Sequence, residues 1–132
     1  MKNLLLTLLA TIFLSGCVLT TPRFDNVEYN RAVELTHSLD ALKAGCQLPS
    51  NIFMEALGTV IWQADGFALY TKHLPGDQAV HSVAQNIKED LVQIQERIAD
   101  QRFNQKYCEI KIKITHKKAE RIMEAMGQEI RN

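Results

Sequence analysis

Residues 80–98 read VHSVAQNIKEDLVQIQERI, and their apolar side chains recur every three or four positions. The recurring residues are Val80, Val83, Ile87, Leu91, Ile94 and Ile98. Such spacing brings apolar side chains onto one face of an α-helix, where they can pack into a core. Between Lys88 and Gln101 the other positions are rich in charged residues and Gln, as on a solvated face. The stretch therefore predicts an amphipathic helix.

Two earlier segments have the same spacing of apolar residues, which we call an apolar stripe. The first consists of Ala32, Leu35, Leu39, Leu42 and Cys46, and the second of Phe53, Leu57, Val60, Ala64 and Phe67. Asp25 or Asn26 could cap the first helix, and Pro49 ends it. Ser50 or Asn51 opens the second helix, which we expect to run to about His73. The following residues, 74–77, read LPGD and predict a turn before the third helix.

The segment from Cys108 to Thr115 fits two patterns. Cys108, Ile110, Ile112 and Ile114 alternate with polar residues, which is typical of a strand. A longer stripe is typical of a helix: Cys108, Ile112, Ala119, Ile122, Met126 and Ile130, with Thr115 in the gap. A lone strand would find no partner strand elsewhere in this chain. We therefore predict a helix over about 107–130, with a strand over 108–115 as the alternative.

Composition limits the fold class and the partners. The 132 residues hold six Gly, three Pro and 7% aromatics, too few turn residues for a small β-sandwich. Fifteen basic residues balance fifteen acidic ones, so no net charge directs the chain to nucleic acid. Short connections join antiparallel neighbours. We therefore predict an all-α, up-down four-helix bundle.

The first 17 residues have the pattern of a secretory leader. A short basic start precedes the apolar run 4–14, which is shorter than the about 20 residues of a membrane-spanning helix. The run ends in Leu14-Ser15-Gly16-Cys17, which resembles the lipobox of bacterial lipoproteins. That resemblance implies cleavage before Cys17, with diacylglycerol on its sulfur and an acyl chain such as palmitate on its new amino group. The alternative is an ordinary signal peptide with a chance cysteine.

The lipoprotein resemblance also implies a place and a domain plan. Val18 follows Cys17, whereas Asp at that position commonly retains such proteins in the inner membrane. A Gram-negative host would therefore place the chain on the outer membrane, facing the periplasm. We divide the chain into a signal peptide (1–16), a lipidated tether (17–24) and a helical domain (25–132).

Two cysteines remain once Cys17 carries lipid. Cys46 and Cys108 would both face an oxidising compartment, where an even pair indicates one disulfide. The up-down topology agrees, because the first helix ends where the fourth begins. The alternative is two separate buried thiols.

The sequence contains no nucleotide-binding glycine motif and no HExxH zinc motif. None of His37, His73, His81 and His116 lies three or four residues from another His, so no helical metal pair exists. His73 and His81 flank the predicted turn, and we interpret them as turn residues. We therefore expect no enzyme activity, no metal, no cofactor and no small-molecule substrate.

A candidate partner-binding surface lies on the second predicted helix. At about 100° per residue, Trp62 falls opposite Phe53 and its core stripe. Leu69 lies beside Trp62, and Gly58 and Gly66 stand one turn away on either side. Since Trp is a preferred interface anchor and each helical Gly is costly, we expect close packing here, either with a partner or within the chain. The alternative is a central helix whose Trp62 is covered by the tether or another helix.

Three functional interpretations follow. In size, leader and cysteine placement the chain resembles pilotins, small lipoproteins that hold a segment of a partner secretin; this implies an adaptor for an envelope protein. The segment 24–29 and the pair Tyr107-Cys108 are also similar to phage-encoded lipoproteins, such as superinfection-exclusion proteins and outer spanins. Third, the basic stretch from Lys106 to Lys118 could bind anionic cell-wall polymer or lipid phosphates, although such a run is usually a solvated face.

Overall fold

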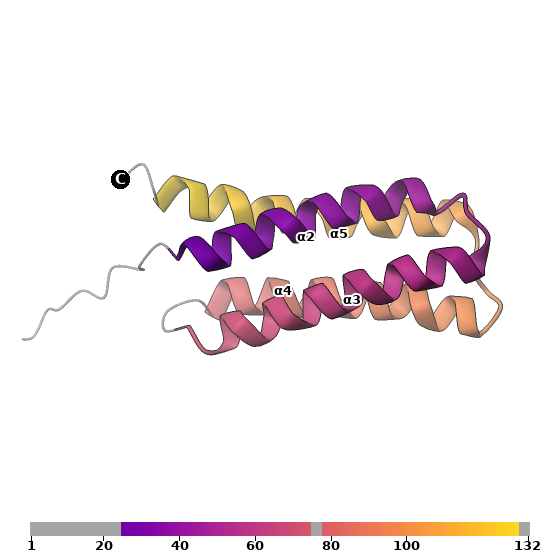
Figure 1. The fold of residues 1–132 in the computed structure, drawn as a ribbon, viewed down its shortest axis with the longest axis horizontal. Helices are drawn as coiled ribbons and strands as arrows, with labels where there is room; N and C mark the ends of the chain where they lie inside the picture. The colour runs from indigo at the N-terminus through magenta and orange to yellow at the C-terminus, as the bar shows by residue number, and fades with distance from the viewer. Residues whose placement is uncertain (1–24, 75–77, 130–132) are drawn as a thin grey trace, which may run out of the picture.

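The computed structural model describes residues 25–74 and 78–129. These residues form four α-helices and contain no strand. The helices are α2 (Asn26–Gly45), α3 (Ser50–Lys72), α4 (Gln78–Ala99) and α5 (Gln105–Glu129). They run up and down in sequence, as Figure 1 shows. The predicted all-α, up-down four-helix bundle is confirmed.

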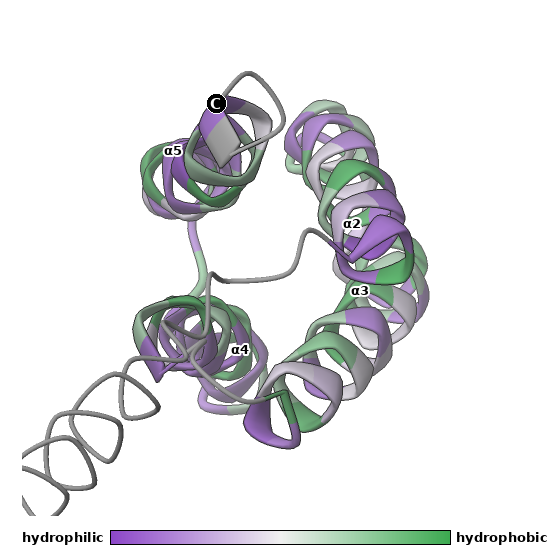
Figure 2. Ribbon diagram, turned by 90° about the vertical axis from the view of Figure 1, so that its left-hand side faces the viewer, coloured by the Kyte–Doolittle hydropathy of each residue, from purple (hydrophilic) through white to green (hydrophobic). Residues whose placement is uncertain are grey.

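The helices stand at the corners of a square when viewed along the bundle (Figure 2). Each packs against two neighbours: α2 against α3 and α5, and α4 against the same two helices. The outer boundaries between α2 and α3 and between α4 and α5 therefore lie on opposite sides of the molecule. This arrangement positions the candidate site, which lies between α2 and α3.

The core is built from the predicted stripes. Every residue of the stripes on α2 and α3 is at most 6% exposed, and so are Ile87, Leu91 and Ile94 of α4. Val80, Val83 and Ile98 pack against this core from its ends and are only partly buried. The apolar spacing thus identified the inward face of each helix.

The segment 108–115 is helical, so the strand alternative is wrong. Cys108, Ile112 and Thr115 are fully buried, whereas Ile110 and Ile114 are 51% and 48% exposed. A strand facing the core would have buried all three isoleucines together. The inward residues instead recur every three or four positions along α5, as in the other helices.

Cys46 and Cys108 form a disulfide, as the sequence predicts. Their Sγ atoms are 2.06 Å apart and their Cα atoms 5.8 Å apart. The bond joins the end of α2 to the beginning of α5, at the end of the bundle opposite the start of α2 (Figure 1). It closes a loop across a sequence separation of 62 residues.

The ends of the helices follow local rules. Asp25 caps α2, since its Oδ1 accepts from the N–H of Val27 at 2.7 Å and of Glu28 at 3.3 Å. Pro49 precedes α3 without a side-chain cap, so neither Ser50 nor Asn51 acts as the cap. Both polar residues lie inside the first turn of α3.

The end of α4 is a left-handed turn that the sequence did not indicate. Gln101 has φ 56°, the only positive φ at a non-Gly residue in the described ranges. The N–H of Arg102 donates to the carbonyl of Arg97 at 2.9 Å, and that of Gln101 to Ile98 at 3.0 Å. These two bonds define a Schellman motif, in which Gly normally takes the left-handed position.

The predicted signal peptide 1–16 and tether 17–24, with Cys17, lie outside the described residues. So do residues 75–77 of the predicted turn and Ile130, proposed for the last stripe. In the described ranges, no helix combines the length and apolar character needed to cross a membrane.

Candidate functional site

Trp62 stands on the solvent side of α3. Its side chain is 76% exposed, and Leu69, two turns further along the same face, is 57% exposed. None of the helices described here covers the indole. Because a bare Trp on a small domain is a typical interface anchor, this face is the leading candidate for a binding surface.

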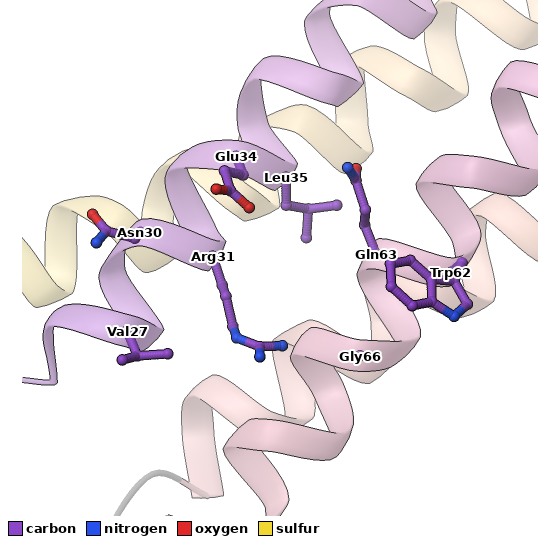
Figure 3. Close-up of a pocket in the computed structure, with 8 residues that line it drawn as sticks. All are labelled: Val27, Asn30, Arg31, Glu34, Leu35, Trp62, Gln63 and Gly66. Atoms are coloured by element: carbon purple, nitrogen blue, oxygen red, sulfur yellow. The ribbon is translucent and has the colours of Figure 1, made fainter.

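A groove runs beside Trp62, between α2 and α3. It has a volume of about 570 Å³ and is open to solvent. Its lining residues are Val27, Asn30, Arg31, Glu34, Leu35, Trp62, Gln63 and Gly66. Figure 3 shows Arg31 reaching from α2 toward α3 beside Gly66, while Trp62 stands on the far wall. We call this surface, together with Gly58 and Leu69, the Trp62 face.

Arg31 is held in position by an aromatic neighbour on α3. Its guanidinium lies 4.9 Å from the centre of the Tyr70 ring. The Tyr70 hydroxyl in turn donates to Asp25 Oδ2 at 2.7 Å, and this hydrogen bond lowers the pKa of Asp25. The cap of α2, the stacked ring and the guanidinium therefore form one chain of contacts from α2 to α3 and back. That chain fixes Arg31 over the groove.

Gly58 and Gly66 leave open space on the exposed face. A methyl group built at Gly58 would meet nothing within 4 Å, and one at Gly66 would meet only Arg31 Nη1, at 3.9 Å. The sequence predicted close packing at both glycines. Within the described residues that packing is absent, so the two positions form hollows beside Trp62.

Three polar groups on the groove lack a hydrogen-bond or ion-pair partner among the described residues. Gln63 Oε1 is buried and has no hydrogen-bond donor there. Arg31 and Glu34 line the same groove with opposite charges, yet neither has an ion-pair partner within 4 Å in ranges 25–74 and 78–129. The groove thus exposes one cation and one anion, with an unpaired acceptor buried beside them.

The predicted basic stretch is not a single face. Lys111 and Lys118 turn inward, and their Nζ atoms lie 2.7 and 2.5 Å from the carboxylate of Asp90 on α4. Thr115 Oγ1 lies 3.3 Å from the same carboxylate. Burial by itself would raise the pKa of Asp90, but the hydrogen bonds from both lysines outweigh it and lower the pKa. The remaining lysines, Lys106, Lys113 and Lys117, are exposed.

The two histidines have separate surroundings, and the interpretation of His81 as a turn residue is wrong, because it lies within α4 and is half-buried. His81 Nδ1 lies 2.9 Å from the carbonyl oxygen of Ala68 and 3.4 Å from Thr71 Oγ1, whereas His73 is exposed at the end of α3. No group of three or more metal-ligating side chains occurs in the described part of the chain.

Comparison with protein-family models, with curated proteins and with solved structures found no match to this chain. The function must therefore be argued from the residues themselves.

Sequence reasoning located Trp62, Leu69 and both glycines, but it missed the α2 side of the groove. Arg31 and Glu34 are ordinary charged residues beside a core stripe, and only the packing of α2 on α3 brings them near Trp62. Asp90 was missed as well, although it directly precedes Leu91 of the core stripe. A carboxylate so close to a core position is the signal that could have revealed its buried ion pairs.

Proposed function

We propose that this chain is a lipid-anchored protein of the bacterial envelope that works by binding another protein through the Trp62 face. The observation that carries the proposal is the exposed Trp62 beside a groove with unpaired polar groups. Such a surface fits an adaptor of the pilotin type, which holds a client rather than transforming a substrate. The anchor would be the lipid on Cys17, in the outer membrane and facing the periplasm.

Two features support the envelope location. The leader ends in the lipobox-like sequence Leu14–Cys17, and the two later cysteines pair with each other. Disulfides persist in oxidising compartments such as the periplasm and are rare in the cytosol. The pairing therefore agrees with export, which the leader implies independently.

The cell-wall alternative receives less support from the geometry. Lys111 and Lys118, two of the five lysines in the basic stretch, are engaged by Asp90 and are not available to an anionic polymer. The phage-encoded alternative is compatible with the same anchored binding module and differs in its client.

The anchor is tested by fractionation of cells. We expect the native chain in the outer-membrane fraction and Cys17→Ser in the soluble periplasmic fraction. Val18→Asp serves as the matched control, since it keeps the lipid and should move the chain to the inner membrane. Outer-membrane sedimentation of Cys17→Ser would show that lipid on Cys17 is not the anchor.

The binding surface is tested by photo-crosslinking in living cells. A photoreactive residue at position 62 should capture one dominant envelope protein, whereas the same residue at Gln93, exposed on α4, should not. Equal capture from both positions, or none from position 62, would refute a specific client site on the Trp62 face.

A further inference from the structure

We infer that the Trp62 face is self-complementary and that a second copy of this chain covers it, by a two-fold exchange of Trp62 into the groove beside Gly66. The inference rests on the proposed binding role of this face and names its first partner. It follows from where the face places its protruding and hollow features and its charges.

Shape complementarity comes from α3 alone. Trp62 protrudes, and Gly66, one helical turn away, is hollow. A two-fold axis that lies in the plane of the face, midway between these residues and perpendicular to α3, makes the α3 helices of the two copies antiparallel. Trp62 of each copy then lies over Gly66 of the other, so that every contact occurs twice, as in an isologous interface.

The same axis also pairs the charges. Arg31 lies beside Gly66, and α2 runs antiparallel to α3, so Glu34, one turn further along α2, is offset from Arg31 in the direction of Trp62. The two-fold operation that exchanges Trp62 and Gly66 therefore moves Arg31 of one copy toward Glu34 of the other. Both groups lack an ion-pair partner within the described single chain.

The groove has the chemistry to receive an indole. A ring seated on Gly66 would lie next to the guanidinium of Arg31, which favours a cation–π contact. Gln63 Oε1 beside the groove is buried and has no donor, so an indole N–H could pair with it only if the Gln63 side chain turned outward. The contact that the incoming Trp side chain makes directly is therefore the one with Arg31.

Self-complementarity favours a second copy over an unrelated protein as the occupant. To bind an unrelated client, a surface needs only a protruding side chain or a hollow, and only a cation or an anion. This face carries a protruding Trp62 and a hollow at Gly66, and both a cation and an anion. One two-fold axis exchanges the members of each pair. An exposed Trp on an anchored protein promotes aggregation. A dimer would cover Trp62 until a client protein displaces the second copy. This would explain why an exposed Trp at this position does not cause aggregation.

The test is the mass of the full chain in density-matched detergent, measured by sedimentation equilibrium over a concentration series. We expect a monomer–dimer equilibrium. Gly66→Leu should weaken the dimer roughly tenfold or more, because its side chain fills the hollow that receives the indole. Within one chain the new Cβ meets only Arg31 at 3.9 Å, and Leu is the better helix former, so the monomer should stay folded. Gly127→Ala, at an open helical glycine of α5, is the matched control and should leave the dimer unchanged.

Charge reversal provides a second, independent test. Arg31→Glu should weaken the dimer, because acidic side chains then face each other across the axis. Adding Glu34→Arg should restore it, since the pair is exchanged in both copies. A chain that stays monomeric at all concentrations, or a double variant no stronger than Arg31→Glu alone, would overturn the inference.

Photo-crosslinking at position 62 in a mixture of heavy- and light-isotope chains separates this inference from the proposed function. Mixed-isotope crosslinks to the peptide that contains Gly66 support the second copy. Capture in cells of a different envelope protein by a chain that sediments as a monomer would leave the adaptor role standing and refute self-association. Crosslinks in cells to a second copy alone would support self-association and refute the adaptor role.

Discussion

Asp90 shows how one buried carboxylate can link two helices. It accepts hydrogen bonds from Lys111 and Lys118 on α5 and is only 7% exposed. Breaking a buried ion pair by removing one partner leaves charges without compensation, which costs about 3–5 kcal/mol in fully buried pairs. Because both lysines are partly exposed and can turn to water, the cost here should be lower, about 2 kcal/mol.

We predict that this ion-pair network makes the free energy of unfolding depend on pH in the acidic range. The pKa of Asp90 is lowered in the folded chain, so its contribution is complete above the unfolded pKa of about 3.9 and is lost as pH falls below it toward the folded pKa. Urea unfolding between pH 2 and 7 should show this loss in the native chain. Asp90→Asn should be less stable at pH 7, with a flatter acid limb. An unchanged acid limb in that variant would rule out Asp90 as a source of the acid dependence.

Trp62 and Phe53 lie on opposite sides of α3 and should respond differently to truncation. Trp62→Ala removes an exposed side chain, so the free energy of unfolding should change by no more than about 0.5 kcal/mol in dilute protein. Phe53→Ala removes a fully buried ring and should cost about 3–5 kcal/mol. Chemical denaturation of both variants makes the comparison. A large loss for Trp62→Ala would place that residue in the core.

Among the helices, α4 has a C-terminal end that a substitution can stabilise. Gln101 occupies the left-handed position of its Schellman motif, where a residue with a Cβ is disfavoured by about 1–2 kcal/mol relative to Gly. We predict that Gln101→Gly raises the free energy of unfolding by about 0.5–1 kcal/mol, since the greater freedom of Gly in the unfolded chain offsets part of the gain. Gln93→Gly, inside α4, is the control and should destabilise. A loss of stability in Gln101→Gly would show that the left-handed turn is not strained.

Helix positions could be predicted from the chain because their causes are local. The spacing of Phe53, Leu57 and Val60 is sufficient to define a buried face, and Pro49 is sufficient to end a helix. The turn at Gln101 could not be predicted in this way, since no Gly marks it. Similarly, the groove could not be predicted, because Arg31 and Gln63 become neighbours only when α2 packs on α3.

For the whole molecule, the disulfide is the strongest single constraint on the unfolded state. Closing a loop of about 60 residues contributes roughly 4 kcal/mol in the chain-entropy model, a large share of the stability of a domain this small. We predict that the Cys46→Ser/Cys108→Ser double variant loses about 2–4 kcal/mol in urea unfolding. The reductant-treated native chain should lose a similar amount. Equal stability with and without reductant would show that the bond does not stabilise the fold.

The bundle places its stabilising features and its proposed binding surface on different parts of the molecule. The disulfide closes the end far from the start of α2, Asp90 joins α4 to α5, and the Trp62 face lies between α2 and α3. Changes on the Trp62 face should therefore alter association without unfolding the domain.

The most direct measurement is the quenching of Trp62 fluorescence by acrylamide as the protein is diluted, because Trp62 is the only Trp in the chain. If a second copy covers the indole as proposed, quenching should be weak in concentrated native protein. It should become strong on dilution and be strong at all concentrations in Gly66→Leu. An indole equally protected at every dilution and in both proteins would show that the chain buries Trp62 itself, which would contradict both an exposed Trp62 face and its cover by a second copy.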